Sequence, residues 1–163
     1  MTPSTTGDLR ADGARRGVRF ERLYKATAEE LWSALTRPKQ LARWLTHATL
    51  EATAGGQVRF DFGDDGDCTG EILVWDPPQT LEYEWRFAGE DESVVRWELH
   101  DAEGGTLLVL DHRRLGADQA TGYAAGWHAH LDVLEGYLAG TAVSWQQRFD
   151  ALLCDYRATS ADA

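Results

Sequence analysis

The sequence predicts a single α+β domain in which a curved antiparallel sheet packs against a long helix near the C-terminus. Three observations predict this class. Between about residues 48 and 115, segments with two-residue alternation of apolar and polar side chains are separated by short turn sequences. A stretch with helical periodicity follows at 121–140. The length of 163 residues suits one domain with one sizeable core.

A strand and two short helices are predicted ahead of the sheet. Residues 18–26 combine β-branched and aromatic side chains before a polar break, which favours a first strand. Thr27 can cap the helix that follows, and Glu30 stands three residues later, as in a capping box. Pro38 suits the first turn of a second short helix, 38–45, because its missing N–H would have no partner there.

Five segments predict the strands of an antiparallel meander. Segments 57–62, 80–87 and 95–99 place large apolar side chains on one face and charged ones on the other. Segments 70–75 and 105–115 carry apolar residues on both faces, as in strands that are more fully buried. The short connections between them imply antiparallel pairing with one face exposed to water.

Two helices are predicted after the sheet. Residues 121–140 carry large apolar side chains at three- and four-residue spacing, and Gly140 is a common helix stop. Residues 145–158 predict a last helix folded against the body.

The domain boundaries follow from composition at the two ends. Residues 1–16 are small and polar, and such a segment buries too little apolar surface to offset its loss of entropy. We therefore expect a disordered lead at 1–16, a single domain at 17–157 and a disordered tail at 158–163.

Charge and cysteine usage exclude several classes of partner. The formal net charge is −11, which repels phosphate backbones and anionic lipid headgroups, so neither nucleic acid nor membrane is expected. No apolar run approaches the roughly 20 residues of a membrane span, and the start of the chain lacks a secretory signal. Cys68 and Cys154 are isolated, which argues against a disulfide or a zinc site. We expect a cytoplasmic protein with no metal and no cofactor.

The histidines at 128 and 130 raise the question of a metal-binding pair. On a helix, residues two apart point about 200° away from each other, so these two cannot hold one ion. His130 lies one turn from Trp127 and is expected to point inward, whereas His128 is expected to point outward. His112 alternates with buried leucines, so it too is expected inward, where it can meet the helix.

Large aromatic side chains gather on the predicted inner face of the sheet. They either fill a solid core or line a cavity for a small apolar ligand. No nucleophile motif is present, and the acidic run 64–67 fits a solvated hairpin better than a calcium loop. We therefore assign no catalytic residue. The candidate ligand-binding residues are Trp44, Phe60, Phe62, Tyr83, Trp85, Trp97, His112, Trp127 and His130.

Four segments resemble a known family over about residues 18–140. They are "TAEELWSALTRPKQLARWL", "GGQVRF", "GEILVWDPPQTLEYEW" and "GWHAHLDVLEGYL". The element order resembles the helix-grip fold of the START/Bet v 1-like superfamily, and the segments resemble the family named for the C-terminal domain of the Hsp90 ATPase activator Aha1. The resemblance implies a curved antiparallel sheet wrapped around a long C-terminal helix, with two short helices after the first strand. It also implies one of several activities, since the family spans ligand carriers, aromatic polyketide cyclases and dehydratases, and co-chaperones.

Three functions follow as hypotheses. The first is a binding protein that holds a small apolar or aromatic molecule between sheet and C-terminal helix, as a monomer or a homodimer. The second is a polyketide-cyclase-type enzyme that uses His112 or His130 as acid and base, with Tyr83 as a donor. The third is an Hsp90-type co-chaperone or protein-interaction module, disfavoured because the sequence lacks the N-terminal domain that accompanies the Hsp90 activators.

Overall fold

The computed structural model describes residues 6–161. The predicted strands and helices occur in the predicted order, with two further strands, β1 and β3, that were not predicted. A 3₁₀ turn at Gly63–Asp65 lies in the β4–β5 hairpin. The elements are β1 (Asp8–Asp12), β2 (Arg15–Tyr24), α1 (Ala28–Thr36), α2 (Pro38–Trp44), β3 (His47–Leu50), β4 (Gln57–Asp61), β5 (Asp67–Asp76), β6 (Thr80–Phe87), β7 (Ser93–Ala102), β8 (Gly105–Leu115), α3 (Ala120–Ala139) and α4 (Trp145–Ala161).

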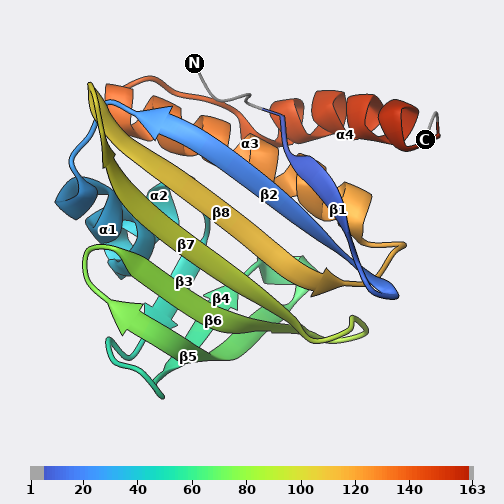
Figure 1. The fold of residues 1–163 in the computed structure, drawn as a ribbon, viewed down its shortest axis with the longest axis horizontal. Helices are drawn as coiled ribbons and strands as arrows, with labels where there is room; N and C mark the ends of the chain where they lie inside the picture. The colour runs from blue at the N-terminus through green and yellow to red at the C-terminus, as the bar shows by residue number, and fades with distance from the viewer. Residues whose placement is uncertain (1–5, 162–163) are drawn as a thin grey trace.

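The strands form one antiparallel sheet in the order β1-β2-β8-β7-β6-β5-β4-β3. Figure 1 shows this curved sheet with the long helix α3 across one face, α4 beside α3, and α1 and α2 at one end. The α+β class and the helix-grip arrangement are confirmed.

Local sequence signals account for the ends of the helices. The Thr27 hydroxyl accepts a hydrogen bond from the backbone N–H of Glu30 at 3.1 Å, and α1 begins at Ala28, directly after Thr27. Pro38 is the first residue of α2, as predicted. Gly140 ends α3 with a φ of 76°, a left-handed conformation that glycine adopts without steric cost.

The core lies between the concave face of the sheet and α3. Alternate residues of β6 are buried, among them Tyr83 and Trp85, and the Trp97 side chain of β7 is 1% exposed. Helix α3 contributes Trp127 and Leu131 to the same core. The two-residue alternation therefore identified the inner face of these strands correctly.

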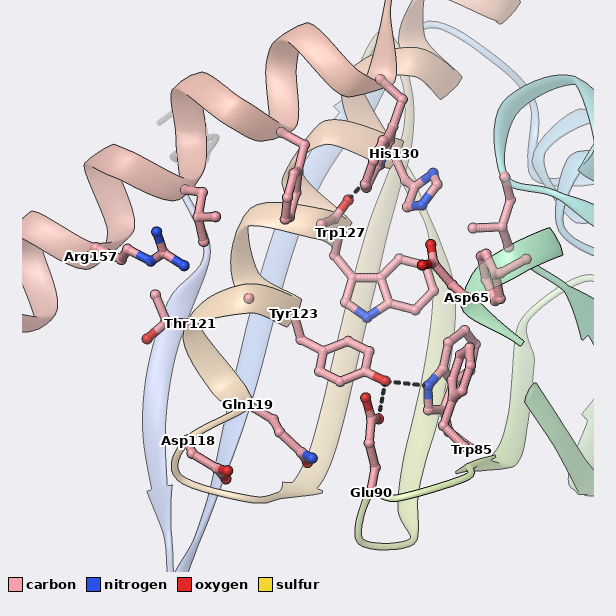
Figure 2. A pocket seen from close by; sticks show the side chains of 18 residues that line it. Asp65, Trp85, Glu90, Asp118, Gln119, Thr121, Tyr123, Trp127, His130 and Arg157 are labelled. Carbon is pink, nitrogen blue, oxygen red and sulfur yellow. Dashed lines mark hydrogen bonds between the residues drawn. The ribbon is translucent and has the colours of Figure 1, made fainter. Parts of the chain in front are cut away.

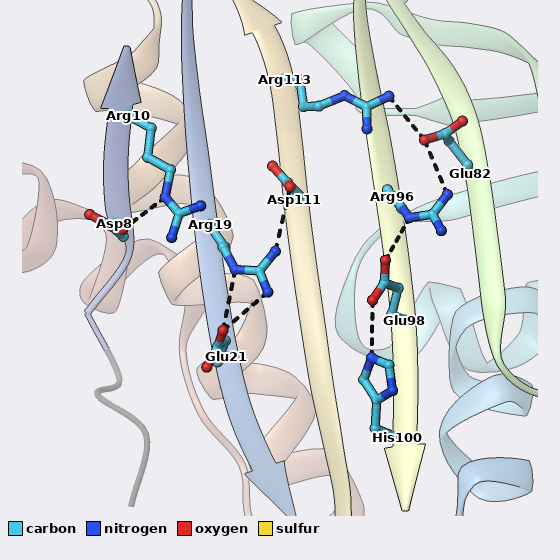
Figure 3. A network of polar contacts seen from close by, with 10 residues as sticks. All are labelled: Asp8, Arg10, Arg19, Glu21, Glu82, Arg96, Glu98, His100, Asp111 and Arg113. Carbon is cyan, nitrogen blue, oxygen red and sulfur yellow. Dashed lines mark hydrogen bonds and ion pairs between the residues drawn. The ribbon is translucent and has the colours of Figure 1, made fainter. Parts of the chain in front are cut away.

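The outer face of the sheet carries a network of ion pairs (Figure 3). Arg96 contacts Glu98 at 2.6 Å and Glu82 at 3.6 Å, and Arg113 contacts Glu82 at 3.0 Å. The hydrogen bond from Arg96 holds the pKa of the Glu98 carboxyl below its usual range. Exposed pairs of this kind add little stability.

The N-terminal segment carries strands within the lead for which we expected disorder. The expected lead, 1–16, contains β1 and the start of β2, paired from Asp8 with Arg19 to Asp12 with Arg15. Backbone pairing rather than apolar burial holds this segment, because the side chains of β1 are mostly exposed. Residues 1–5 lie outside the described chain.

The C-terminal helix α4 also extends beyond its expected end. It continues to Ala161, within the expected disordered tail, 158–163, of which residues 162 and 163 lie outside the described part. The prediction that this segment is a helix folded against the body is confirmed, since α4 packs along α3. Across residues 6–161, no helix combines the length and apolarity needed to cross a bilayer.

Candidate functional site

A pocket of about 500 Å³ opens between α3, α4 and the end of β6, and we call it the α3–α4 pocket (Figure 2). It lies at one end of the aromatic interior, and both the sheet and the two C-terminal helices contribute walls. Its lining residues are Leu45, Phe62, Asp65, Trp85, Phe87, Glu90, Asp118, Gln119, Thr121, Gly122, Tyr123, Gly126, Trp127, His130, Trp145, Phe149, Leu153 and Arg157.

Aromatic rings form the walls of the pocket. The rings of Trp85 and Trp127 lie 5.4 Å apart between their centroids, one from the sheet and one from α3. On the opposite side Trp145 stacks on Phe149, with centroids 4.7 Å apart and an interplanar angle of 11°. Such rigid rings offer large apolar contact area to a flat ligand at small entropic cost.

Two glycines of α3 leave this space open. Gly122 and Gly126 are one turn apart and both line the pocket, and a Cβ atom added to either would meet no heavy atom within 4 Å. Gly136 on the same helix differs, because its Cβ would lie 2.6 Å from the Thr141 carbonyl oxygen. Glycine inside a helix costs about 1 kcal/mol relative to alanine. Close packing requires glycine at position 136, whereas glycine at positions 122 and 126 leaves open space in the pocket.

A chain of hydrogen bonds crosses the inner part of the pocket. The Trp85 indole Nε1 donates to the Tyr123 hydroxyl at 2.9 Å, and that hydroxyl donates to the Glu90 carboxylate. Burial and the Glu90 carboxylate both raise the pKa of Tyr123. The hydroxyl therefore stays protonated and fixes the position of one Glu90 oxygen.

His130 presents a neutral ring to the pocket. Its Nδ1 donates to the carbonyl oxygen of Trp44 at 3.2 Å, which leaves Nε2 with a lone pair. Burial lowers the pKa of His130 to about 4, so the ring is neutral at pH 7. Its ring centroid lies 5.1 Å from that of Trp145 and 6.0 Å from that of Trp127.

His112 is a structural link between sheet and helix. Its Nδ1 accepts a hydrogen bond from the Trp127 indole at 2.9 Å, so Nε2 carries the proton and donates to the Ser93 hydroxyl at 2.7 Å. Burial lowers the pKa of His112 to about 3. The side chain points inward and meets α3, but both nitrogens are occupied and it does not line the pocket.

The structure divides the nine candidate residues into two groups. Tyr83 accepts a hydrogen bond from the Trp97 indole at 3.0 Å, and Trp97 packs edge-on against Trp44. One end of the aromatic interior is therefore packed core and the other end is cavity. Those that line the pocket are Phe62, Trp85, Trp127 and His130, and those buried away from it are Trp44, Phe60, Tyr83, Trp97 and His112.

Trp145 lies where the sequence analysis did not place it. None of the nine candidate residues lies on the last helix, yet the Trp145 indole donates to the Gly126 carbonyl oxygen at 3.2 Å and its ring lines the pocket. Tyr123 and Glu90 were also missed as lining residues, the latter because it lies in a turn. The four-residue spacing of Gly122 and Gly126 is the sequence signal that could have indicated this site.

The outward orientation expected for His128 is wrong. The side chain is buried, and its Nδ1 lies 2.9 Å from the Tyr156 hydroxyl of α4. Helix α4 covers the side of α3 that an isolated amphipathic helix would expose. His128 therefore packs between helices while His130 faces the pocket. Within residues 6–161, no group of three or more His, Cys, Asp or Glu side chains could hold a metal ion.

Comparisons with known proteins identify the family. The model of the family described as Activator of Hsp90 ATPase homolog 1-like protein matches residues 25–139. CalU16 from Micromonospora echinospora superposes with a TM-score of 0.80 at 25% identity, over 93% of this chain and 95% of that chain. A Bordetella parapertussis protein, encoded by gene BPP1335, gives a TM-score of 0.72 at 31% identity, over 96% of this chain and 94% of that one.

DynU16, described as a protein in the dynemicin biosynthetic locus, gives a TM-score of 0.70 at 30% identity. The similarity covers 76% of this chain and 47% of DynU16, so the two differ in length. Among curated proteins, none matches the chain. The family match ends with α3, so the wall that α4 adds to the pocket lies outside it. Because the match spans more than half of the sequence, the chain belongs to the family of Activator of Hsp90 ATPase homolog 1-like proteins.

Proposed function

We propose that this protein binds a small aromatic or apolar molecule in the α3–α4 pocket and acts as a binding protein. The observation that carries the proposal is the pocket itself, about 500 Å³ of space walled by tryptophan, phenylalanine and tyrosine rings. Cavities of this size, mostly apolar with a few polar groups, are the usual form of small-molecule sites.

The energy available from such a pocket suits micromolar binding. Burying ~300 Å² of apolar ligand surface at about 25 cal/mol per Å² contributes several kcal/mol before ordering costs. The polar chain from Trp85 through Tyr123 to Glu90 offers a fixed point that can orient the ligand. The helix destabilisation caused by Gly122 and Gly126 also supports a role for the open space.

The family and its members support the same class of function. The helix-grip fold is a ligand-binding fold, and DynU16 comes from a biosynthetic locus, a setting of small-molecule chemistry. The geometry favours the two alternatives less. In a cyclase that uses His112 or His130 with Tyr83, only His130 lines the pocket, whereas His112 and the donor Tyr83 are buried outside it. A co-chaperone surface on the outer sheet face would have to use charges that already pair with one another.

A pair of tryptophan variants tests the proposal. Trp145 and Trp75 are both half-buried, but only Trp145 lines the pocket. The Trp75 ring packs against the Trp32 ring instead, with centroids 5.1 Å apart. With anthracene-methanol as the probe and its fluorescence anisotropy as the readout, saturable binding is expected. Trp145→Ala should weaken it about tenfold, since it removes both burial and ring stacking, and Trp75→Ala should leave it unchanged. No saturable binding, or equal effects of the two variants, would refute the assignment.

A further inference from the structure

The charged groups around the α3–α4 pocket are mostly acidic. Three acidic side chains line it, Asp65, Glu90 and Asp118, against Arg157 as the one basic side chain that is ionised at pH 7. Glu90 is half-buried and stands inside the pocket, whereas Asp65, Asp118 and Arg157 are exposed. Figure 2 shows Arg157 on α4, well away from the Trp85–Tyr123–Glu90 chain. The charge in the buried part of the pocket, which Glu90 carries, is therefore negative.

The Glu90 carboxylate is held in place with one oxygen available. Its Oε1 accepts the hydrogen bond from Tyr123, and no other side chain in residues 6–161 bonds this carboxylate. The backbone N–H of Glu90 donates to the Phe87 carbonyl oxygen at 3.1 Å, which fixes the turn that carries it. A carboxylate that is already oriented can accept a hydrogen bond from a ligand with little further loss of entropy.

His130 provides a second acceptor in the pocket. His130 donates through Nδ1 to Trp44, so its Nε2 can only accept a hydrogen bond from a ligand. The Tyr123 hydroxyl already donates its one hydrogen bond to Glu90. Glu90 and His130 thus each offer an acceptor to a ligand group that carries N–H donors, and the Gln119 amide, which also lines the pocket, can both donate and accept.

The walls add a second attraction for positive charge. The rings of Trp85, Trp127 and Trp145 line the same space. Aromatic faces carry negative potential, and tryptophan is the most favourable ring for a cation within about 6 Å of its centroid. The carboxylate and the ring faces therefore favour the same sign of ligand charge in a site where burial reduces screening.

We propose that the ligand of the α3–α4 pocket is a cationic amine attached to an aromatic ring system, with its ammonium group against Glu90. The ring system stacks between Trp145 and the pair formed by Trp85 and Trp127. The ammonium donates to the available Glu90 oxygen. This inference rests on the proposed function of the same pocket.

Three probes with one ring and different charge test the inference. They are anthracene-methylamine, anthracene-methanol and anthracene-carboxylate, measured by anthracene fluorescence anisotropy at pH 7 and moderate salt. We expect the amine to bind about tenfold or more tightly than the alcohol, the scale of one charge-assisted hydrogen bond, and the carboxylate to bind most weakly. Glu90→Gln keeps an oxygen for Tyr123 but removes the charge, so it should abolish the preference for the amine over the alcohol.

A matched control separates local from general electrostatics. Glu92 lies in the same hairpin, two residues from Glu90, is exposed, and pairs with Arg86 instead of lining the pocket. Glu92→Gln removes the same formal charge and should leave the preference for the amine intact. Equal binding of amine and alcohol, tighter binding of the carboxylate, or an equal loss in both variants would overturn the inference while the pocket remains a ligand site. Failure of all three probes to bind would overturn the proposed function with it.

Discussion

Substitution of Gly126 separates the stability of α3 from the openness of the pocket. Glycine inside a helix costs about 1 kcal/mol relative to alanine, and an added Cβ here meets no heavy atom within 4 Å. Gly126→Ala should therefore raise the free energy of unfolding by about 1 kcal/mol and the Tm by about 2–4 °C. Gly126→Leu keeps most of that gain in helix propensity, but its side chain extends into the pocket.

Gly126→Leu should leave the Tm at or above that of the parent protein while it weakens probe binding. We expect Gly126→Leu to melt no lower than the parent protein and to bind anthracene-methanol at least about tenfold more weakly. Gly136→Ala serves as a control, because its Cβ would lie 2.6 Å from a backbone oxygen and should lower the Tm. A stable Gly126→Leu protein that binds the probe as well as the parent would refute the reasoning, since the space beside Gly126 would then hold no ligand.

Two further predictions concern stability. Asp132 forms ion pairs with Arg148 of α4, at 2.8 Å, and with Arg22 of β2, whose side chain is 6% exposed. Asp132→Ala leaves the buried Arg22 without this partner, so it should lower the free energy of unfolding by ~3–5 kcal/mol in urea titrations. A change below about 1 kcal/mol would contradict a stabilising role of this ion cluster. Burial lowers the pKa values of His112 and His130 to about 3 and about 4, from 6.5, so the unfolded chain binds more protons as the pH falls below 6.5. The free energy of unfolding should then fall by up to about 1.4 kcal/mol per pH unit for each histidine between pH 6.5 and pH 4, and His112→Gln should reduce this slope; an unchanged slope would show that His112 does not contribute.

The sequence predicted the buried strands well and the edge strands poorly. Segments 80–87 and 105–115 match β6 and β8 at both ends, because a strand with a buried face must alternate or be apolar throughout. Strands β1 and β3 lie at the two edges of the sheet, and we predicted neither. β1 has mostly exposed side chains and is held by backbone bonds to β2, which leave no apolar pattern in the sequence.

The candidate site was predictable only in part because it depends on α4. Alternation placed Phe62, Trp85 and Tyr83 on one inner face, but it could not tell which of them border empty space. That distinction depends on where the chain runs after residue 140, since α4 brings Trp145 over the pocket and at the same time covers His128. Periodicity within one helix shows which side chains share a face, but it does not show which distant segment of the chain packs against that face.

The most direct test of the pocket uses the indole N–H signals of the seven tryptophans, observed by NMR during titration with anthracene-methanol. Trp85, Trp127 and Trp145 line the pocket and each donates an indole hydrogen bond, whereas Trp32 and Trp75 pack against each other outside it. We expect the first three signals to shift saturably with one dissociation constant, and the signals of Trp32 and Trp75 to stay in place. Saturable shifts confined to Trp32 and Trp75, or no shift at Trp85, Trp127 and Trp145 when the probe is bound, would contradict the assignment of the ligand site to the α3–α4 pocket.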